Sequence, residues 1–209
     1  MKQIDEAASK GMAQVYIAHR LTVDLMTENK PALIIVDMIN DYVHPDGELY
    51  GETLHDVVPT IDRLITVFHD LNLPVVYANT SVVSDEQPMV KKWGVHAERG
   101  TWGAKVVEEI APSESDYVVR KPMYDGFYDT ELDHILRSLD VTEVVLTGVD
   151  SHVCVLQTGI GAANRNYDVT VAEDGMSTKE QHKHEFAINY TESHLGRVMD
   201  HQDLVSYLK

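Results

Sequence analysis

One cysteine, one aspartate and one lysine stand in this chain where their side chains could act as a chemical unit. Cys154 is the only cysteine among the 209 residues and lies in the stretch TGVDSHVCVLQTG. Asp37 follows the apolar run PALIIV, and Lys121 ends the run YVVRK. A carboxylate can take a thiol proton, a thiolate is a nucleophile, and an ammonium stabilises its charge. Together they could attack a carbonyl carbon and form a thioester that water then hydrolyses.

Each of these residues also has an ordinary structural interpretation. A lone cysteine is most often a small buried hydrophobe. An aspartate after a strand can cap a turn or a helix, and a lysine at a strand end is most often solvated. The joint placement of all three at strand ends favours chemistry. Spacing alone leaves both interpretations open.

The elements that would position these residues alternate between short apolar runs and helical patterns. Strands are expected at residues 31–38, 73–78, 117–121, 143–147 and 168–172. Helices are expected at residues 57–71, 130–139, 153–166 and 178–199, with a shorter one at 103–110 and an irregular segment at 79–101. This alternation predicts an α/β fold with a doubly wound, mostly parallel sheet and helices on both faces. The site of such a sheet lies outside the carboxyl ends of its strands.

The helix after the fourth strand is expected to influence the thiol directly. Ser151 is a plausible N-cap for a helix that begins near Val153, which places Cys154 in the first turn. The partial positive charge of a helix start and the Lys121 ammonium would both stabilise a thiolate. Backbone N–H groups of the tight turn at 148–154 could hold an oxyanion.

The composition of the chain limits which partners it can bind and in which cellular compartment we expect it. The formal net charge is −17, from 34 acidic and 17 basic side chains. Such a surface repels nucleic acid and anionic lipid, so we expect neither as a partner. The chain has no 18-residue apolar run and no apolar leader at its N-terminus, and one cysteine cannot form an internal disulfide. We expect a cytoplasmic protein, with a helical extension at residues 1–30 and one domain at 31–209.

Two long stretches resemble the isochorismatase-like cysteine hydrolases. They are PALIIVDMINDYVHPDGELYG and RKPMYDGFYDTELDHILRSLDVTEVVLTGVDSHVCV, and the resemblance runs from about Pro31 to the final helix. Its motifs are an aspartate that closes the first strand, a lysine before Tyr-x-x-Phe, and Thr-Gly-x-x-Ser/Thr-x-x-Cys-Val. The resemblance implies a three-layer sandwich and a catalytic triad at Asp37, Lys121 and Cys154. It also implies an oxyanion hole from the backbone N–H groups of Asp150 and Cys154, a cis peptide bond between Val149 and Asp150, and a homo-oligomer.

This chain differs from the family motifs at several positions, and these differences affect the expected metal binding and substrate. The family's nicotinamidases hold a metal with an Asp-x-His-Pro-type motif after the second strand, where this chain has YANTSVVSDEQPM. We therefore predict no metal and no cofactor. Isochorismatases themselves lack the nucleophilic cysteine, so Cys154 argues against vinyl-ether hydrolysis. Ile39 and Tyr42 replace the Gln and Phe of the usual first motif, and both could alter the pocket beside Asp37.

The segment KKWGVHAERGTWGAKVV resembles the metal-free members, which include carbamoylsarcosine-, ureidoacrylate- and biuret-type amidohydrolases. The candidates for contact with a small substrate are Trp93, His96, Tyr124 and Phe127, with packing against the core or a neighbouring subunit as the alternative. His182 and His184 are interpreted as surface residues.

Three hypotheses follow from these residues. The first is a cysteine-dependent hydrolase of a C–N bond in a small amide or ureido compound. The second is a hydrolase of the same fold with another substrate, such as nicotinamide. The third is a redox-sensing or ligand-binding thiol protein without hydrolytic activity.

Overall fold

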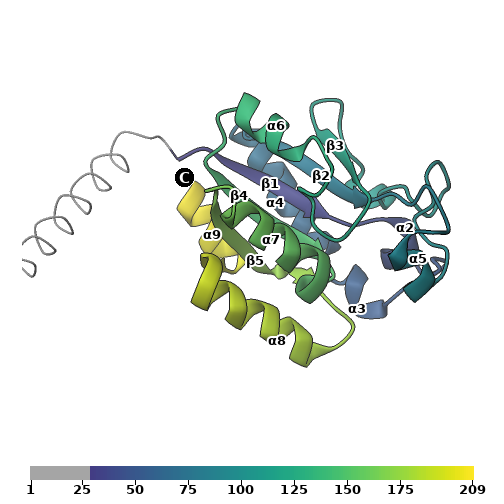
Figure 1. Cartoon of the computed structure of the whole chain (residues 1–209). Coiled ribbons are helices and arrows are strands. Elements are labelled where there is room, and N and C mark those ends of the chain that lie inside the picture. The colour runs from purple at the N-terminus through teal and green to yellow at the C-terminus, as the bar shows by residue number, and fades with distance from the viewer. Residues whose placement is uncertain (1–28) are drawn as a thin grey trace, which may run out of the picture.

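Six parallel strands form the centre of the computed structural model, which describes residues 29–209 (Figure 1). The predicted helical extension therefore lies almost wholly outside the described residues. The strands are β1 (Pro31–Val36), β2 (Val75–Thr80), β3 (Tyr117–Lys121), β4 (Glu143–Val149), β5 (Asp168–Ser177) and β6 (Arg197–Met199). Their order in the sheet is β3-β2-β1-β4-β5-β6. The chain thus builds outward from β1 to β3 and returns to place β4 beside β1.

This return creates a switch point between β1 and β4, where the strand order reverses direction. Val36 at the end of β1 is in register with Ala78 of β2 on one side and Gly148 of β4 on the other. Thr80 at the end of β2 pairs with Lys121 at the end of β3. The carboxyl ends of four strands consequently meet at one edge, which is where sites form in such sheets.

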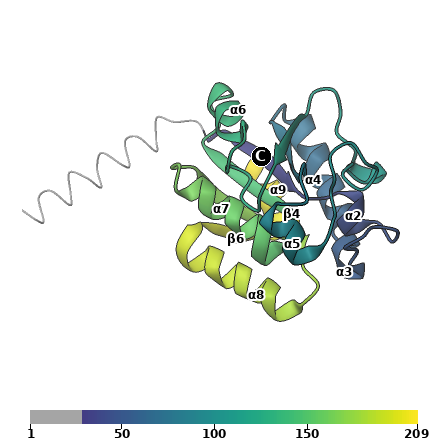
Figure 2. The same cartoon turned by 45° about the vertical axis from the view of Figure 1, so that its right-hand side comes forward.

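Helices cover both faces of the sheet (Figures 1 and 2). One face packs against α4 (Val58–Asp70) and α9 (His201–Leu208). The opposite face packs against α6 (Leu132–Ser138), α7 (Leu156–Ala163) and α8 (Gln181–Tyr190). Both faces of β1 are buried, because Ala32, Ile34 and Val36 belong to one core and Leu33 and Ile35 to the other. This arrangement confirms the predicted doubly wound α/β sandwich.

Short elements complete the described chain. They are α2 (Asn40–Val43), α3 (Glu52–His55), α5 (Pro88–Trp93), the 3-10 turn η1 (Glu108–Ile110), and the π-helical segments η2 (Ser151–Val155) and η3 (Thr191–Leu195). Figure 1 places α2, α3 and α5 on the right-hand side of the molecule. Helix α5 falls within the segment expected to be irregular, and the helix expected at 103–110 is only the short η1.

The C-terminal region differs from the predicted helix at 178–199. The structure divides those residues into α8, η3 and strand β6, and then adds α9. Strand β6 has only three residues, too few for an alternating pattern to appear in the sequence. Asp200 is the N-cap of α9, and its carboxylate accepts hydrogen bonds of 2.8 Å from the backbone N–H groups of Gln202 and Asp203. That N-cap was an available signal for the helix start.

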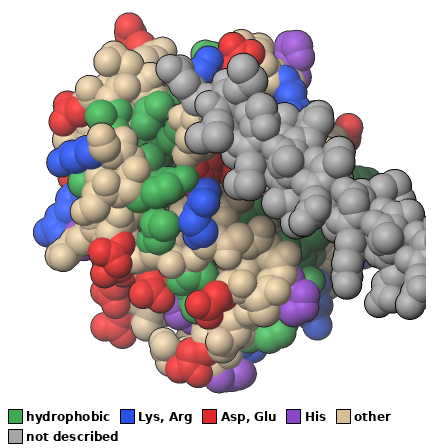
Figure 3. Space-filling view, turned by 90° about the vertical axis from the view of Figure 1, so that its left-hand side faces the viewer, with side chains coloured by type: hydrophobic (Ala, Val, Ile, Leu, Met, Phe, Trp, Pro, Cys, Tyr) green, Lys and Arg blue, Asp and Glu red, His purple; other side chains and the backbone are tan. Residues whose placement is uncertain are grey.

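The surface reflects the excess of acidic side chains. Figure 3 shows one face on which carboxylates gather at the lower edge, while lysines and arginines lie apart in small groups. Within residues 29–209, no helix combines the length and apolarity that a membrane crossing requires.

Candidate active site

Asp37 and Lys121 form a buried ion pair at the carboxyl edge of the sheet. Lys121 Nζ lies 2.8 Å from Asp37 Oδ2, and neither residue is exposed to solvent. Lys121 Nζ also donates to Thr80 Oγ1 at 2.8 Å and to the carbonyl oxygen of Met123 at 3.3 Å. Burial opposes the charge on Lys121, but the adjacent Asp37 carboxylate and the Cys154 side chain outweigh it and raise the pKa of the lysine. Lys121 is therefore held as an ammonium.

Thr80 locks the Asp37 carboxylate in place. The backbone N–H of Thr80 donates to Asp37 Oδ1 at 2.6 Å, and its hydroxyl donates to Asp37 Oδ2 at 3.1 Å. Asp37 itself adopts a left-handed backbone conformation with φ of 55°, directly after β1. This turn directs its side chain toward the ends of β2 and β3. Thr80 was not selected from the sequence, because the second strand was expected to end at residue 78, whereas β2 continues to Thr80.

Cys154 lies beside this ion pair, as the sequence predicted. Both Asp37 and Lys121 act on its side chain as close neighbours, and the cysteine is 8% exposed. Burial raises the pKa of the Cys154 thiol well above its usual range; Lys121 lowers it and Asp37 raises it again. Lys121 therefore favours a thiolate as expected, but burial and Asp37 have the larger effect on the pKa. The thiol is neutral, because loss of solvation and the carboxylate outweigh the lysine.

The loop before Cys154 depends on a close approach between β4 and β1. Gly148 has a φ of 105°, and a Cβ atom there would lie 2.0 Å from the carbonyl oxygen of Val36. Only glycine fits at this position. The next peptide bond but one, between Val149 and Asp150, is cis, as the family resemblance implied. The chain then enters the helical segment that carries the thiol.

Ser151 does not cap this helix, contrary to the prediction. The segment begins at Ser151 itself as the π-helical turn η2, with Asp150 at the N-cap position and no side-chain cap. The Ser151 hydroxyl instead lies 3.3 Å from Nδ1 of His184, which is half-buried rather than a surface residue. Cys154 nevertheless lies in the first turn, where backbone N–H groups lack partners within the helix.

The side chains of Tyr42 and Asp150 also approach the thiol. From the sequence, Tyr42 was expected to alter the pocket beside Asp37, and Asp150 was expected to contribute only its backbone N–H. Burial raises the pKa of the Tyr42 phenol well above its usual range, and the nearby Asp37 and Cys154 raise it further. Burial also raises the pKa of Asp150, with smaller lowering effects from Thr178 and His152. Oδ1 of Asp150 has no hydrogen-bond partner among the described residues. Tyr42 and Asp150 thus add a phenol and a carboxyl group to the surroundings of Cys154.

Comparison with known proteins decides the family. The model of the isochorismatase domain matches residues 31–203. This chain belongs to the isochorismatase family. Its sequence is 30% identical over 169 residues to YaaI, an uncharacterised isochorismatase-family protein of Bacillus subtilis, covering 80% of this chain and 92% of that one.

Solved structures agree with this isochorismatase-family assignment. N-carbamoylsarcosine amidase from Thermoplasma acidophilum is 37% identical with a TM-score of 0.76, covering 82% of this chain and 96% of its own. A nicotinamidase/pyrazinamidase from Bacillus subtilis is 25% identical with a TM-score of 0.78, covering 82% of this chain and 100% of its own. The chain is therefore an isochorismatase-like hydrolase by family.

The structure places the four candidates for substrate contact in three different environments: a partly exposed pair, a buried site near α2, and the core. Trp93 is 53% exposed, and its indole N–H donates to the Tyr124 hydroxyl at 3.2 Å. His96 is buried, with its ring centroid 5.8 Å from that of Tyr42. Phe127 is buried in the same core as Cys154 and stacks on Tyr167 at 5.9 Å. A substrate contact by any of the four stays a prediction.

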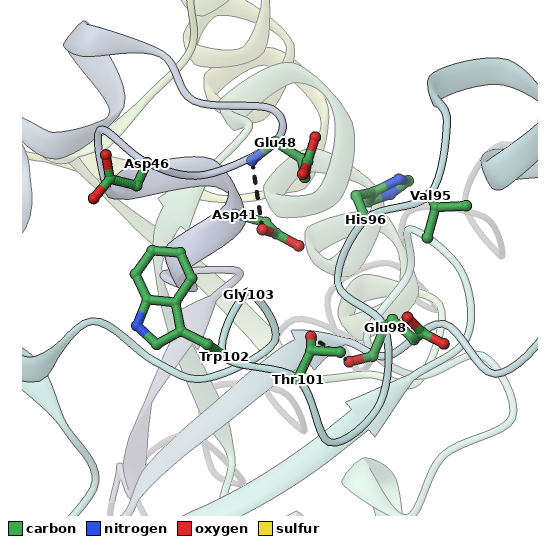
Figure 4. Close-up of a pocket in the computed structure, with 9 residues that line it drawn as sticks. All are labelled: Asp41, Asp46, Glu48, Val95, His96, Glu98, Thr101, Trp102 and Gly103. Atoms are coloured by element: carbon green, nitrogen blue, oxygen red, sulfur yellow. Dashed lines mark hydrogen bonds between the residues drawn. The ribbon is translucent and has the colours of Figure 1, made fainter.

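His96 also lines a cavity of about 570 Å³ beside α2 (Figure 4). Figure 4 shows Asp41 between His96 and Trp102, with the backbone N–H of Glu48 bonded to the Asp41 carboxylate. Asp41 Oδ2 also accepts from the backbone N–H of Ala97 at 2.6 Å. The Asp41 carboxylate thus joins the loop after α2 to the segment around Ala97.

Among the described residues, no three histidine, cysteine, aspartate or glutamate side chains form a group that could hold a metal ion. The metal-free expectation stays a prediction, as does the absence of a cofactor.

Proposed function

We propose that this protein hydrolyses a C–N bond in a small amide or ureido compound, with Cys154 as the nucleophile. The observation that carries the proposal is the buried Asp37–Lys121 pair at 2.8 Å with the neutral Cys154 thiol beside it. A carboxylate, an ammonium and a thiol in one dry site form a complete set for acyl transfer.

In the first half of the reaction, Asp37 takes the proton from the Cys154 thiol as sulfur attacks the carbonyl carbon. The high pKa of the thiol makes proton removal part of the attack, rather than a step completed beforehand. Lys121 stays protonated and stabilises the negative charge that develops near sulfur and oxygen. Its contact with Asp37 keeps that carboxylate ionised and correctly oriented.

The tetrahedral intermediate places its negative oxygen near the backbone N–H groups of Asp150 and Cys154. Collapse of this intermediate breaks the C–N bond, and Asp37 returns its proton to the departing amine. A thioester then remains on Cys154. Water attacks the thioester with Asp37 again as the base, which releases the acid and restores the thiol.

The ureido class is supported by the N-carbamoylsarcosine amidase, which at 37% identity is more similar than the 25%-identical nicotinamidase/pyrazinamidase. A nicotinamide-type substrate is the second candidate, because the Bacillus subtilis nicotinamidase/pyrazinamidase shares the fold over its whole length. A thiol that only senses oxidants is disfavoured, since sensing requires a low pKa and burial raises the pKa of Cys154.

Ammonia release from a panel of small carboxamides and N-carbamoyl acids tests the proposal. Wild type, Cys154→Ala and Cys154→Ser are assayed in parallel, each with and without a chelator. The proposal expects release from at least one compound by wild type, unaffected by chelator, and loss of about 10³-fold or more in both variants.

Release that persists in Cys154→Ala would contradict the role of the thiol. Release of ammonia from nicotinamide that disappears with chelator would favour the second candidate. A matched control is available in Ser177→Ala, because Ser177 lies at the end of β5 and its hydroxyl bonds the Thr53 carbonyl oxygen instead of the site.

A further inference from the structure

A second cavity, of about 450 Å³, lies at the ends of β2 and β3 under the segment 99–112. Asn79 of β2 and Arg120 of β3 are partners in register, and the next pair is Thr80 and Lys121. Side chains alternate between the faces of a sheet. Asn79 and Arg120 therefore point away from the Asp37–Lys121 pair. Thr80 also lines the cavity, so the cavity adjoins the candidate active site from the opposite face of the sheet.

Three basic side chains line this cavity: Arg99, Lys105 and Arg120. Its lining contains no aspartate or glutamate, although the chain has 34 acidic and only 17 basic side chains. None of the three cations forms an ion pair with a carboxylate in residues 29–209. Arg99 Nε donates to the Ser81 hydroxyl at 3.1 Å, but no carboxylate of the described residues neutralises any of the three cations.

Asn79 supplies a second and independent sign of a ligand. The residue lines the cavity and is only 5% exposed. Its Oδ1 has no hydrogen-bond partner among the described residues. A buried amide oxygen without a donor costs free energy that a bound donor would recover.

We propose that this cavity binds a small oxyanion that also carries a hydrogen-bond donor. The guanidinium groups of Arg99 and Arg120 suit the paired oxygens of a phosphate or carboxylate. Lys105 adds a third positive charge. Asn79 Oδ1 accepts from an O–H or N–H of the same molecule. Hydrogen phosphate and hydroxycarboxylates share this chemistry.

A flat acidic surface of a second copy fits these observations less well. Such a surface could neutralise Arg99, Lys105 and Arg120, which are all exposed. It could not bring a donor to Asn79, which is almost wholly buried. A small molecule that enters the cavity satisfies both the cations and the amide.

Titration calorimetry on the full chain tests the proposal at fixed ionic strength, because screening by salt weakens any anion site. Phosphate is compared with sulfate, which has the same shape but no O–H at pH 7. Glycolate is compared with acetate in the same way. We expect phosphate to bind with one site per chain and sulfate to bind about five- to tenfold more weakly.

Variants locate the binding. Arg99→Gln and Arg120→Gln should each weaken phosphate binding by at least about tenfold. Asn79→Leu should remove the preference for phosphate over sulfate. Arg63→Gln, an exposed arginine on α4 outside the cavity, should change nothing.

Glycolate binding without acetate binding would identify a hydroxycarboxylate as the ligand class, and phosphate binding alone would identify a phosphate. Failure of all four anions to bind, or binding that ignores Arg99→Gln and Arg120→Gln, would overturn the proposal. Light scattering on the same variants measures their oligomeric state, which gives a further way to contradict the proposal. Dissociation of an oligomer without any anion binding would assign the cations to an interface between copies. None of these binding measurements requires hydrolysis, so their outcome does not depend on whether Cys154 is the nucleophile.

Discussion

Two ion pairs lie at opposite ends of the same sheet, and they differ in what surrounds them. Asp37–Lys121 is at the carboxyl ends of the strands, where both side chains are fully buried beside a thiol. Glu143–Arg197 is at the amino end of β4 and the start of β6, with N–O separation of 3.0 Å. The arginine of this second pair is 43% exposed in its side chain.

The Glu143 carboxylate is fully satisfied by its neighbours. Besides Arg197 it accepts hydrogen bonds from Thr170, from Asn29 at 2.6 Å and from Tyr207 at 2.9 Å. Burial raises its pKa, but these donors outweigh burial and lower the pKa overall. The group links strands β4, β5 and β6 to helix α9, and the single cysteine of the chain lies at the opposite end of the sheet. This group is a structural site, whereas Asp37–Lys121 keeps a reactive side chain in reach.

The largest expected difference between the two pairs is in catalysis. Asp37→Asn and Lys121→Met should each lower hydrolysis about 10²- to 10⁴-fold, because one removes the base and the other removes charge stabilisation. Glu143→Gln should leave the turnover number within about twofold. Steady-state kinetics on a substrate found by ammonia release would measure this. Equal losses of activity in all three variants would contradict the assignment of Asp37–Lys121 as catalytic and Glu143–Arg197 as structural.

The second-largest difference between the two ion pairs is expected in how much their loss destabilises the folded protein. Lys121→Met leaves the Asp37 carboxylate buried and unpaired, at a cost of about 3–5 kcal/mol in the free energy of unfolding. Glu143→Gln should cost only about 1–3 kcal/mol, because Arg197 can turn to water. Urea unfolding measures both changes.

The double variant Asp37→Asn/Lys121→Met removes both charges together. It should regain most of the stability lost by Lys121→Met while staying inactive. A double variant as unstable as the single one would show that packing, rather than the unpaired charge, causes the loss.

The thiol offers a third contrast, measured by its pH-dependent alkylation. Because the pKa of Cys154 is raised, the rate of reaction with iodoacetamide should keep rising above pH 9 in wild type. Asp37→Asn should move the rise to lower pH, since the Asp37 carboxylate contributes to the raised pKa. Glu143→Gln should leave the profile unchanged. A thiol that alkylates fully at pH 7 would contradict the neutral state.

The smallest expected effect is the acid dependence of stability at Glu143. Its pKa in the folded protein lies below the ordinary value of 4.5. The stability that Glu143 contributes is therefore present above pH 4.5 and is lost as the pH falls through the lowered value. The advantage of wild type over Glu143→Gln should shrink on acidification from pH 6 toward pH 3. An advantage that grows over this range would reverse the assigned sign.

Much of the candidate site could be predicted from the sequence, because parallel strands bring their carboxyl ends to one edge. Asp37 and Lys121 each close an apolar run, and Cys154 follows another, so three local patterns were enough to place them together. Gly148 and the cis bond after Val149 came with the motif around the cysteine.

Other features depend on three-dimensional contacts that no local pattern records. The raised pKa of Cys154 results mainly from burial. A sequence pattern that marks a helix start does not show how deeply the thiol is buried. Thr80 and Tyr42 approach the triad only after the strands and the first loop have packed. Strand β6 is formed by pairing with β5 and is too short to show a period of its own.

The central claim is that Cys154 forms a covalent acyl intermediate, and mass spectrometry of rapidly quenched reactions tests it most directly. With a substrate found by ammonia release, the peptide that carries Cys154 should gain the mass of the acyl group during turnover. The adduct should disappear when substrate is exhausted and should be absent from Cys154→Ala. Steady turnover by a Cys154→Ala variant, or an adduct on any other residue, would contradict the account.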